Sequence, residues 1–154
     1  MWFKSMIILW IKIFINTPMI KKSHKNHIKT LTKTRHILRF GEYGFKIMSS
    51  VTFTKEQIES LNRNLLKKLK IVSINSKNYK FWTLLKTNKT LTKLSLESRM
   101  GKGKGSIYTE AVFLQAGSII YEFMNLKNHQ ILELFAFFKK QIPRTEIRLI
   151  NQNK

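Results

Sequence analysis

The stretch "YTEAVFLQAGSIIYEFM", residues 108–124, predicts the centre of the fold. It contains two runs rich in β-branched and aromatic residues, which favour β-strands. Ala116 and Gly117 separate the runs, and a short connection containing glycine is typical of a β-hairpin. We therefore expect 108–115 and 118–124 to be two strands joined by a hairpin.

One helix is predicted on each side of this stretch. Residues 54–70, "TKEQIESLNRNLLKKLK", begin with Thr54 and Gln57 at the spacing of a capping box. Apolar residues follow at helical spacing: Ile58, Leu61, Leu65 and Leu69. Residues 128–141, "NHQILELFAFFKKQ", form a second helix that Pro143 ends. Its predicted apolar face is Ile131, Phe135, Phe138 and Ile142.

Shorter segments complete the predicted sheet. "YKFWTLL" (79–85) and "TEIRLI" (145–150) have the composition of strands, and "FGEYGFK" (40–46) is typical of a turn or bulge leading into one. This order of elements favours an α+β fold, a compact sandwich of a mainly antiparallel sheet packed against two helices. Residues 1–39 form a basic N-terminal extension, 40–150 the domain and 151–154 a C-terminal tail.

The charge indicates a polyanionic partner. Lys and Arg number 29 against eight acidic residues, all of them glutamate, and the formal net charge is +21. A folded chain with this charge repels itself unless it binds a polyanion, and RNA is the obvious candidate.

The chain has no cysteine and no aspartate, so thiolate metal sites and a Ser-His-Asp set are excluded. We expect no catalytic residues, no metal and no cofactor, and assign His24 and His27 to the basic extension.

The extension has two open interpretations. Its apolar part, residues 6–15, is interrupted by Lys12 and is too short to span a bilayer, so no membrane insertion is expected. No acidic residue precedes Glu42, which suits an import presequence or a basic segment threading into RNA.

Three of the six glycines lie in "RMGKGKGS", residues 99–106. The stretch lacks the first glycine and the ending of a P-loop, and it does not fit the dinucleotide-binding pattern. Alternating glycine and lysine does give a bare main chain that can approach a surface closely, beside cations that bind phosphate. The alternative is a flexible exposed loop.

Six stretches, taken in order, resemble the bacterial-type large-subunit ribosomal protein sixteen family, which is related to the eukaryotic large-subunit protein ten. They are "FGEYGFK" (40–46), "TKEQIES" (54–60), "KFW" (80–82), "RMGKGKG" (99–105), "QAGSIIYEF" (115–123) and "KKQIP" (139–143). The chain departs from the family where Thr109 and Glu110 replace a Tyr-Trp pair, and where "KTNKTLTKLS" (86–95) replaces a proline-rich segment.

The resemblance implies a structural constituent of the large ribosomal subunit and not an enzyme. It implies binding to large-subunit rRNA near the peptidyl transferase centre and a role in organising the tRNA-binding site. Its partners would be that rRNA, tRNA acceptor arms and neighbouring large-subunit proteins. The loop facing rRNA and tRNA would be Arg99, Met100, Gly101, Lys102, Gly103, Lys104 and Gly105. We expect further rRNA contacts at Arg35, Arg39, Lys46, Arg63, Lys67 and Lys70.

The departures, with a composition that indicates AT-rich coding, favour a mitochondrial ribosome in the matrix over a plastid or the bacterial cytoplasm. Two other classes stay open at this point. One is a basic RNA-processing enzyme that uses some of the glutamates. The other is a membrane-surface protein with residues 2–15 as an interfacial helix and its lysines on anionic lipid.

Overall fold

The computed structural model describes residues 21–24, 31, 36–73, 78–99, 101, 103–142 and 145–152. In this part of the chain two helices and two antiparallel sheets form an α+β fold, as predicted. The elements are β1 (Tyr43–Ile47), β2 (Val51–Thr54), α2 (Lys55–Val72), β3 (Lys80–Thr83), β4 (Lys89–Lys93), β5 (Ser106–Leu114), β6 (Ile119–Met124), α3 (Asn128–Gln141) and β7 (Ile147–Asn151). Pro143 and most of the N-terminal extension lie outside the described residues.

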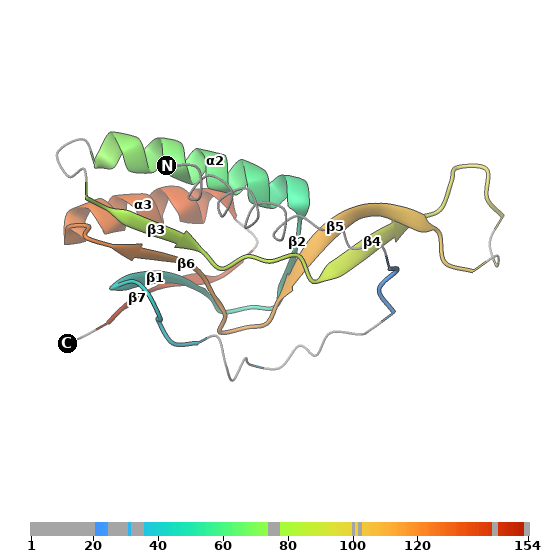
Figure 1. The fold of residues 1–154 in the computed structure, drawn as a ribbon, viewed down its shortest axis with the longest axis horizontal. Helices are drawn as coiled ribbons and strands as arrows, with labels where there is room; N and C mark the ends of the chain where they lie inside the picture. The colour runs from blue at the N-terminus through green and yellow to red at the C-terminus, as the bar shows by residue number, and fades with distance from the viewer. Residues whose placement is uncertain are drawn as a thin grey trace, which may run out of the picture.

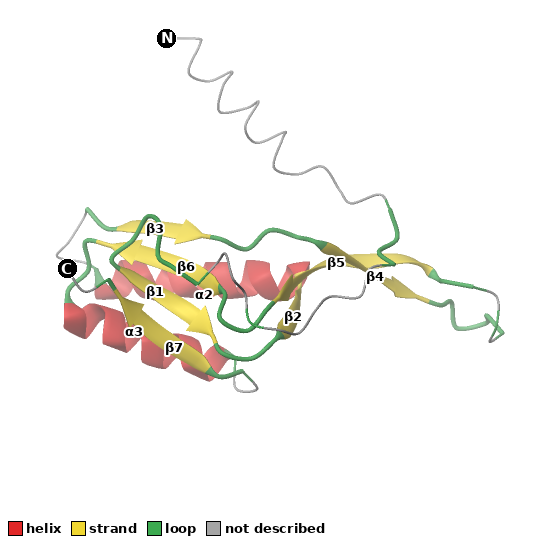
Figure 2. Cartoon of the chain, turned by 90° about the horizontal axis from the view of Figure 1, so that it is seen from below, coloured by secondary structure: helices red, strands yellow, loops and turns green. Residues whose placement is uncertain are grey.

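The strands divide into two sheets. Sheet A has the order β3-β6-β1-β7, and sheet B has the order β2-β5-β4. Figure 2 shows the strands of sheet A lying in front of both helices, which therefore cover one face of that sheet only. In Figure 1, β4 and β5 run away from the helices toward the opposite end of the molecule. The core lies between sheet A and the helices and includes Phe53 of β2 and Val112 and Leu114 of β5, whereas β4 and the loop end of β5 reach outward.

Helix α2 forms as the sequence predicts. The Thr54 N–H donates to the Gln57 side-chain oxygen at 3.0 Å, and the Gln57 N–H donates to the Thr54 hydroxyl at 3.3 Å, which completes the capping box. The buried residues of the helix are the four predicted ones, Ile58, Leu61, Leu65 and Leu69. Burial of each such side chain contributes about 1.5–3 kcal/mol, which anchors the helix on the core.

Helix α3 has the predicted bounds but a slightly different buried face. Leu134 is fully buried, whereas Phe135 is only partly buried against the core. Phe138 packs on Phe45 of β1 with 5.0 Å between ring centroids. The α3 side chains of Gln130 and Gln141 also hydrogen-bond to α2, at Val72 O (2.9 Å) and Asn64 (3.0 Å) respectively, so the two helices run antiparallel.

The predicted hairpin between β5 and β6 is wrong. Strand β5 pairs with β2 and β4, whereas β6 pairs with β1 and β3. The turn between them is bound to the end of β1, because the Gly117 N–H donates to Ile47 O at 2.6 Å and the Ile47 N–H donates to Ser118 O at 2.9 Å. Those bonds direct the chain out of sheet B and into sheet A.

Strands β2 and β4 were not predicted from the sequence. Strand β4 lies in the lysine-rich segment 86–95 and pairs with β5 from Lys89 to Lys93. Just before β4, the Asn88 side chain bonds to the backbone of β5: it accepts from the Phe113 N–H at 2.8 Å and donates to Phe113 O at 3.0 Å. A polar, lysine-rich segment therefore becomes an edge strand by pairing with a long neighbour.

Candidate RNA-binding surface

The loop between β4 and β5 is the most prominent candidate site. Strands β4 and β5 carry it to the end of the molecule far from the helices (Figure 1). Of the predicted loop residues, Arg99, Gly101, Gly103 and Lys104 are exposed, and Gly105 is partly buried. Met100 and Lys102 lie outside the described residues. The hairpin thus presents cations and glycine backbone away from the body of the protein.

The three glycines of this loop serve different purposes. Gly101 and Gly103 have φ values of 101° and 71°, a region that favours glycine, and the space around both is open. Gly105 lies against the neighbouring strand instead, since a Cβ there would be 2.4 Å from Lys93 O. Two glycines therefore shape the exposed loop, and the third closes the hairpin stem.

Residues 21–24 of the extension lie along β4 at the base of the loop. The Ser23 N–H donates to the Thr90 hydroxyl at 2.8 Å, and that hydroxyl donates to Lys21 O at 3.1 Å. The Lys22 ammonium donates to Lys104 O at 2.9 Å, and the Lys104 ammonium donates to Ser23 O. These contacts add the charge of Lys21 and Lys22 to that of the loop.

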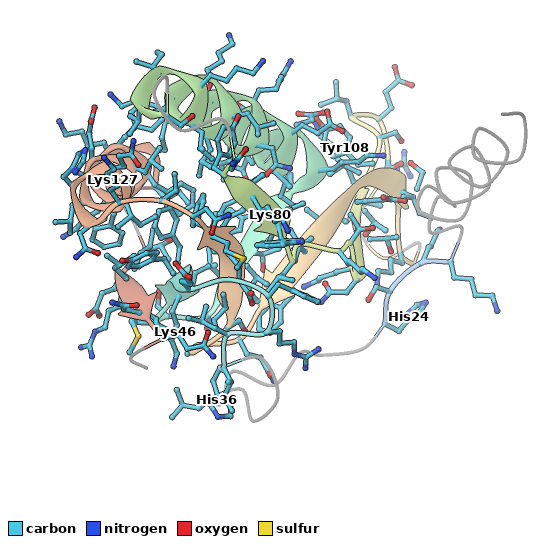
Figure 3. The ribbon with its side chains drawn as sticks, turned by 60° about the vertical axis from the view of Figure 1, so that its left-hand side comes forward. His24, His36, Lys46, Lys80, Tyr108 and Lys127 are labelled. Atoms are coloured by element: carbon cyan, nitrogen blue, oxygen red, sulfur yellow. The ribbon has the colours of Figure 1, made fainter. Side chains whose placement is uncertain are left out.

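A second group of predicted cations lies on the outer face of sheet A, the face away from the helices. Lys46 alternates with Phe45 and Ile47, which are fully buried on the helix side, so Lys46 points outward. Arg39 lies beside the same face, and Arg35 lies outside the described residues. Figure 3 shows Lys46 and His36 on the side of the molecule opposite α2.

A third group lies on α2. Arg63, Lys67 and Lys70 are exposed and follow one another at helical spacing, opposite the buried stripe. The described cations predicted as contacts therefore occupy three separate surfaces: the hairpin tip, the outer face of sheet A, and α2.

Three ion pairs join residues that the structure describes. The ion pairs formed within the described residues are Lys55 with Glu110 (4.0 Å), Lys68 with Glu133 (2.5 Å) and Arg148 with Glu146 (3.7 Å). None of them involves a predicted RNA contact. Glu110 pairs with Lys55 and so links β5 to the start of α2. The described residues contain no cluster of three possible metal ligands, and none of their helices is long and apolar enough to cross a membrane.

Exposed apolar side chains of the hairpin were not predicted from the sequence. Tyr108 is 65% exposed on β5, and the Lys93 ammonium lies 5.7 Å from the centre of its ring. Leu96, in the loop, is fully exposed. An aromatic ring beside a cation is a feature that stacks on nucleic-acid bases. The pairing of β4 with β5 brings Tyr108 and Lys93 together, and without it nothing in the sequence connects them.

Comparison with known proteins gives consistent matches over most of the chain. Residues 9–147 match the family model described as "Ribosomal protein L16p/L10e", so the match begins within the N-terminal extension. The chain is 41% identical over 132 residues to the "Large ribosomal subunit protein uL16m" of Chondrus crispus, covering 86% of this chain and 94% of that protein. It is 30% identical over 128 residues to the "Large ribosomal subunit protein uL16" of Thermosipho africanus, covering 82% and 86%. The protein of that name from Thermosipho melanesiensis is 27% identical over the same length.

Proposed function

The chain belongs to the ribosomal protein L16p/L10e family, and from this premise we propose that it binds large-subunit rRNA near the peptidyl transferase centre and helps to organise the tRNA-binding site. The family consists of ribosomal proteins and not of enzymes, so the chain is a structural constituent of the large ribosomal subunit with rRNA and ribosomal partners.

The observation that carries the proposal is the projecting hairpin with its basic, glycine-rich tip. Arg99 and Lys104 are exposed there beside Gly101 and Gly103, whose surroundings are open. Exposed backbone N–H groups and cations bind phosphate oxygens, and such contacts fix the position and orientation of the RNA. A loop carried away from the protein body can reach RNA that the body does not touch. It would contact both rRNA and tRNA acceptor arms, while neighbouring large-subunit proteins contact other surfaces.

The body would hold the protein on rRNA. Exposed cations on α2 and on the outer face of sheet A give it two further binding surfaces. Each phosphate contact releases counterions, so affinity for single-stranded RNA falls with salt by about 0.7 log unit per contact for each log unit of salt. In this account the protein performs no chemistry and only organises the RNA around it.

A mitochondrial location, in the ribosomes of the matrix, is part of the proposal. Its support is the 41% identity to the Chondrus crispus protein, whose name, uL16m, carries the suffix used for mitochondrial ribosomal proteins. Fractionation of cells followed by immunodetection tests it. The protein should enrich with mitochondrial ribosomes, and enrichment with plastid ribosomes would contradict the assignment.

The loop's role is tested by replacing Arg99, Lys102 and Lys104 with alanine. We expect the variant to fold normally but to impair assembly of the large subunit or accommodation of tRNA. The matched control replaces Lys127, Lys139 and Lys140, which are exposed on or beside α3, and so removes the same charge. Normal assembly and translation with the loop variant would contradict the proposed role.

A further inference from the structure

A short segment crosses the outer face of sheet A just before β1. This strap, residues 37–41, contacts three strands. Leu38 is buried over Gly44 of β1, where a Cβ would lie 2.4 Å from the leucine Cδ2. The Phe40 ring stacks on Trp82 of β3, with centroids 5.9 Å apart and planes at 27°. Between them lies Glu122 of β6, which pairs with both Gly44 and Trp82 in the sheet.

Glu122 fixes the strap in place. Its carboxylate is fully buried and accepts three consecutive backbone N–H groups: Arg39 at 3.2 Å, Phe40 at 2.7 Å and Gly41 at 2.9 Å. Gly41 also lies directly on β6, since a Cβ there would be 2.6 Å from Phe123 O. The backbone that carries Arg39 and Phe40 is therefore held rigidly.

This rigid strap presents an aromatic ring to solvent. Phe40 remains 56% exposed although it stacks on Trp82. Beside it is a cleft of about 340 Å³, a volume at the lower end of the range of roughly 300–1,000 Å³ that small-molecule sites have. The cleft is lined by Ile37, Arg39, Phe40, Thr83, Leu84 and Lys86.

The positive charge of the cleft favours an anionic ligand. Arg39 and Lys86 are both exposed, and none of the described residues that line the cleft is acidic. A planar apolar surface beside two cations matches a nucleotide, whose base stacks on an aromatic ring while its phosphate accepts from Arg or Lys. Bases in a duplex have no free face, so the ligand must be unpaired.

We propose that this cleft binds one unpaired nucleotide of rRNA, with its base stacked on Phe40 and its phosphate held by Arg39 and Lys86. The proposal rests on the proposed function, because it takes rRNA as the ligand, and it names a contact separate from the hairpin loop. Because Glu122 holds the strap before RNA arrives, binding loses little conformational entropy at this site.

Two measurements on the full-length protein test the site. The first is the affinity for large-subunit rRNA transcribed in vitro, measured over a range of salt. Replacement of Phe40 with Leu removes the aromatic ring and should weaken binding about tenfold without changing the salt slope. Phe40→Tyr, which keeps an aromatic ring, should bind as tightly as the unmodified protein. The double variant Arg39→Gln with Lys86→Gln should instead reduce the salt slope, by about 0.7 for the one phosphate that both side chains hold.

The second measurement is ultraviolet cross-linking of purified large subunits, followed by mass spectrometry of the peptides. A ribonucleotide adduct is expected on the peptide containing Phe40 or on that containing Trp82, and Phe40→Leu should reduce it. The matched control is Leu132→Ala on α3, because Leu132 is also 56% exposed and lies outside the cleft. It should change neither the adduct nor the affinity.

The outcomes separate the two proposals. If the unmodified protein fails to bind the rRNA and does not sediment with large subunits, the proposed function fails and this site fails with it. If it binds rRNA but Phe40→Leu binds equally well and no adduct forms at the cleft, only this site is excluded. A cross-link from the cleft to a neighbouring protein in place of RNA would also overturn it.

Discussion

Gly103 and Gly105 lie two residues apart, yet they differ in what a side chain would meet. At Gly103 (φ 71°) the surrounding space is open, so Asn, which tolerates a left-handed backbone, should cost less than about 1 kcal/mol. At Gly105 any Cβ meets Lys93 O at 2.4 Å, so Gly105→Asn should destabilise the fold by about 1–3 kcal/mol. Chemical denaturation of both variants measures the difference. Equal loss of stability would show that the stem does not pack as closely as described.

Glu122 is the buried carboxylate on which the strap depends. Glu122→Gln keeps the shape but replaces an acceptor oxygen with an amide that faces three N–H donors. Because hydrogen bonds to charged groups are worth about 1.5–3 kcal/mol, we expect a loss of that order in unfolding free energy. We also expect faster hydrogen exchange at Arg39, Phe40 and Gly41.

The control for this prediction is Glu133→Gln on α3, whose carboxylate is 53% exposed in its pair with Lys68. Exposed pairs contribute about 0–1 kcal/mol, so this change should cost much less. Unchanged exchange of the strap in Glu122→Gln would contradict the role given to the carboxylate.

At the residue scale the sequence could point to the glycine loop, because its composition is unusual in a chain with six glycines. It could not assign Gly105 to the stem, because that depends on pairing with β4, a strand the sequence did not predict. The role of Glu122 was equally hidden. Its N–H partners lie more than 80 positions away in the chain, and no local pattern connects them.

At the scale of elements, the helices were predictable and the strand pairing was not. The capping box and apolar spacing of α2 are local, and both were confirmed, as were the bounds of α3. The connection after Gln115 has the composition of a hairpin turn. Its hydrogen bonds to Ile47 depend on β1, more than 60 residues earlier, and they send β6 into the other sheet.

The proposed phosphate contacts of helix α2 can be tested by removing its exposed cations. Replacing Arg63, Lys67 and Lys70 with Gln should leave the helix folded, since all three are exposed and Gln is a good helix former. If each contacts a phosphate, rRNA affinity should fall and the salt slope should decrease by about 2.

The corresponding control replaces Lys127, Lys139 and Lys140 with Gln, which removes the same charge from exposed positions on or beside α3. Equal slopes for the two variants would mean that the α2 cations act only through net charge and make no specific phosphate contacts.

For the whole molecule, the net charge and the distribution of the cations both favour a polyanionic partner. The net charge of +21 predicted a polyanionic partner, and the structure spreads the described cations over a projecting hairpin and two faces of the body. The fold class was predictable from the order of elements, but the division into two sheets was not, because it follows from long-range pairing. A protein with cations on several sides is suited to lie among RNA segments, where each surface meets a different one.

The central claim is that the protein is held in the large ribosomal subunit by RNA. Sedimentation of a native organelle lysate through a high-salt gradient, with and without prior RNase, tests it most directly. The account predicts that the protein stays with the large subunit in high salt and leaves it after RNase. A protein that sediments free of the subunit in the untreated lysate, or floats with membranes, would contradict the account.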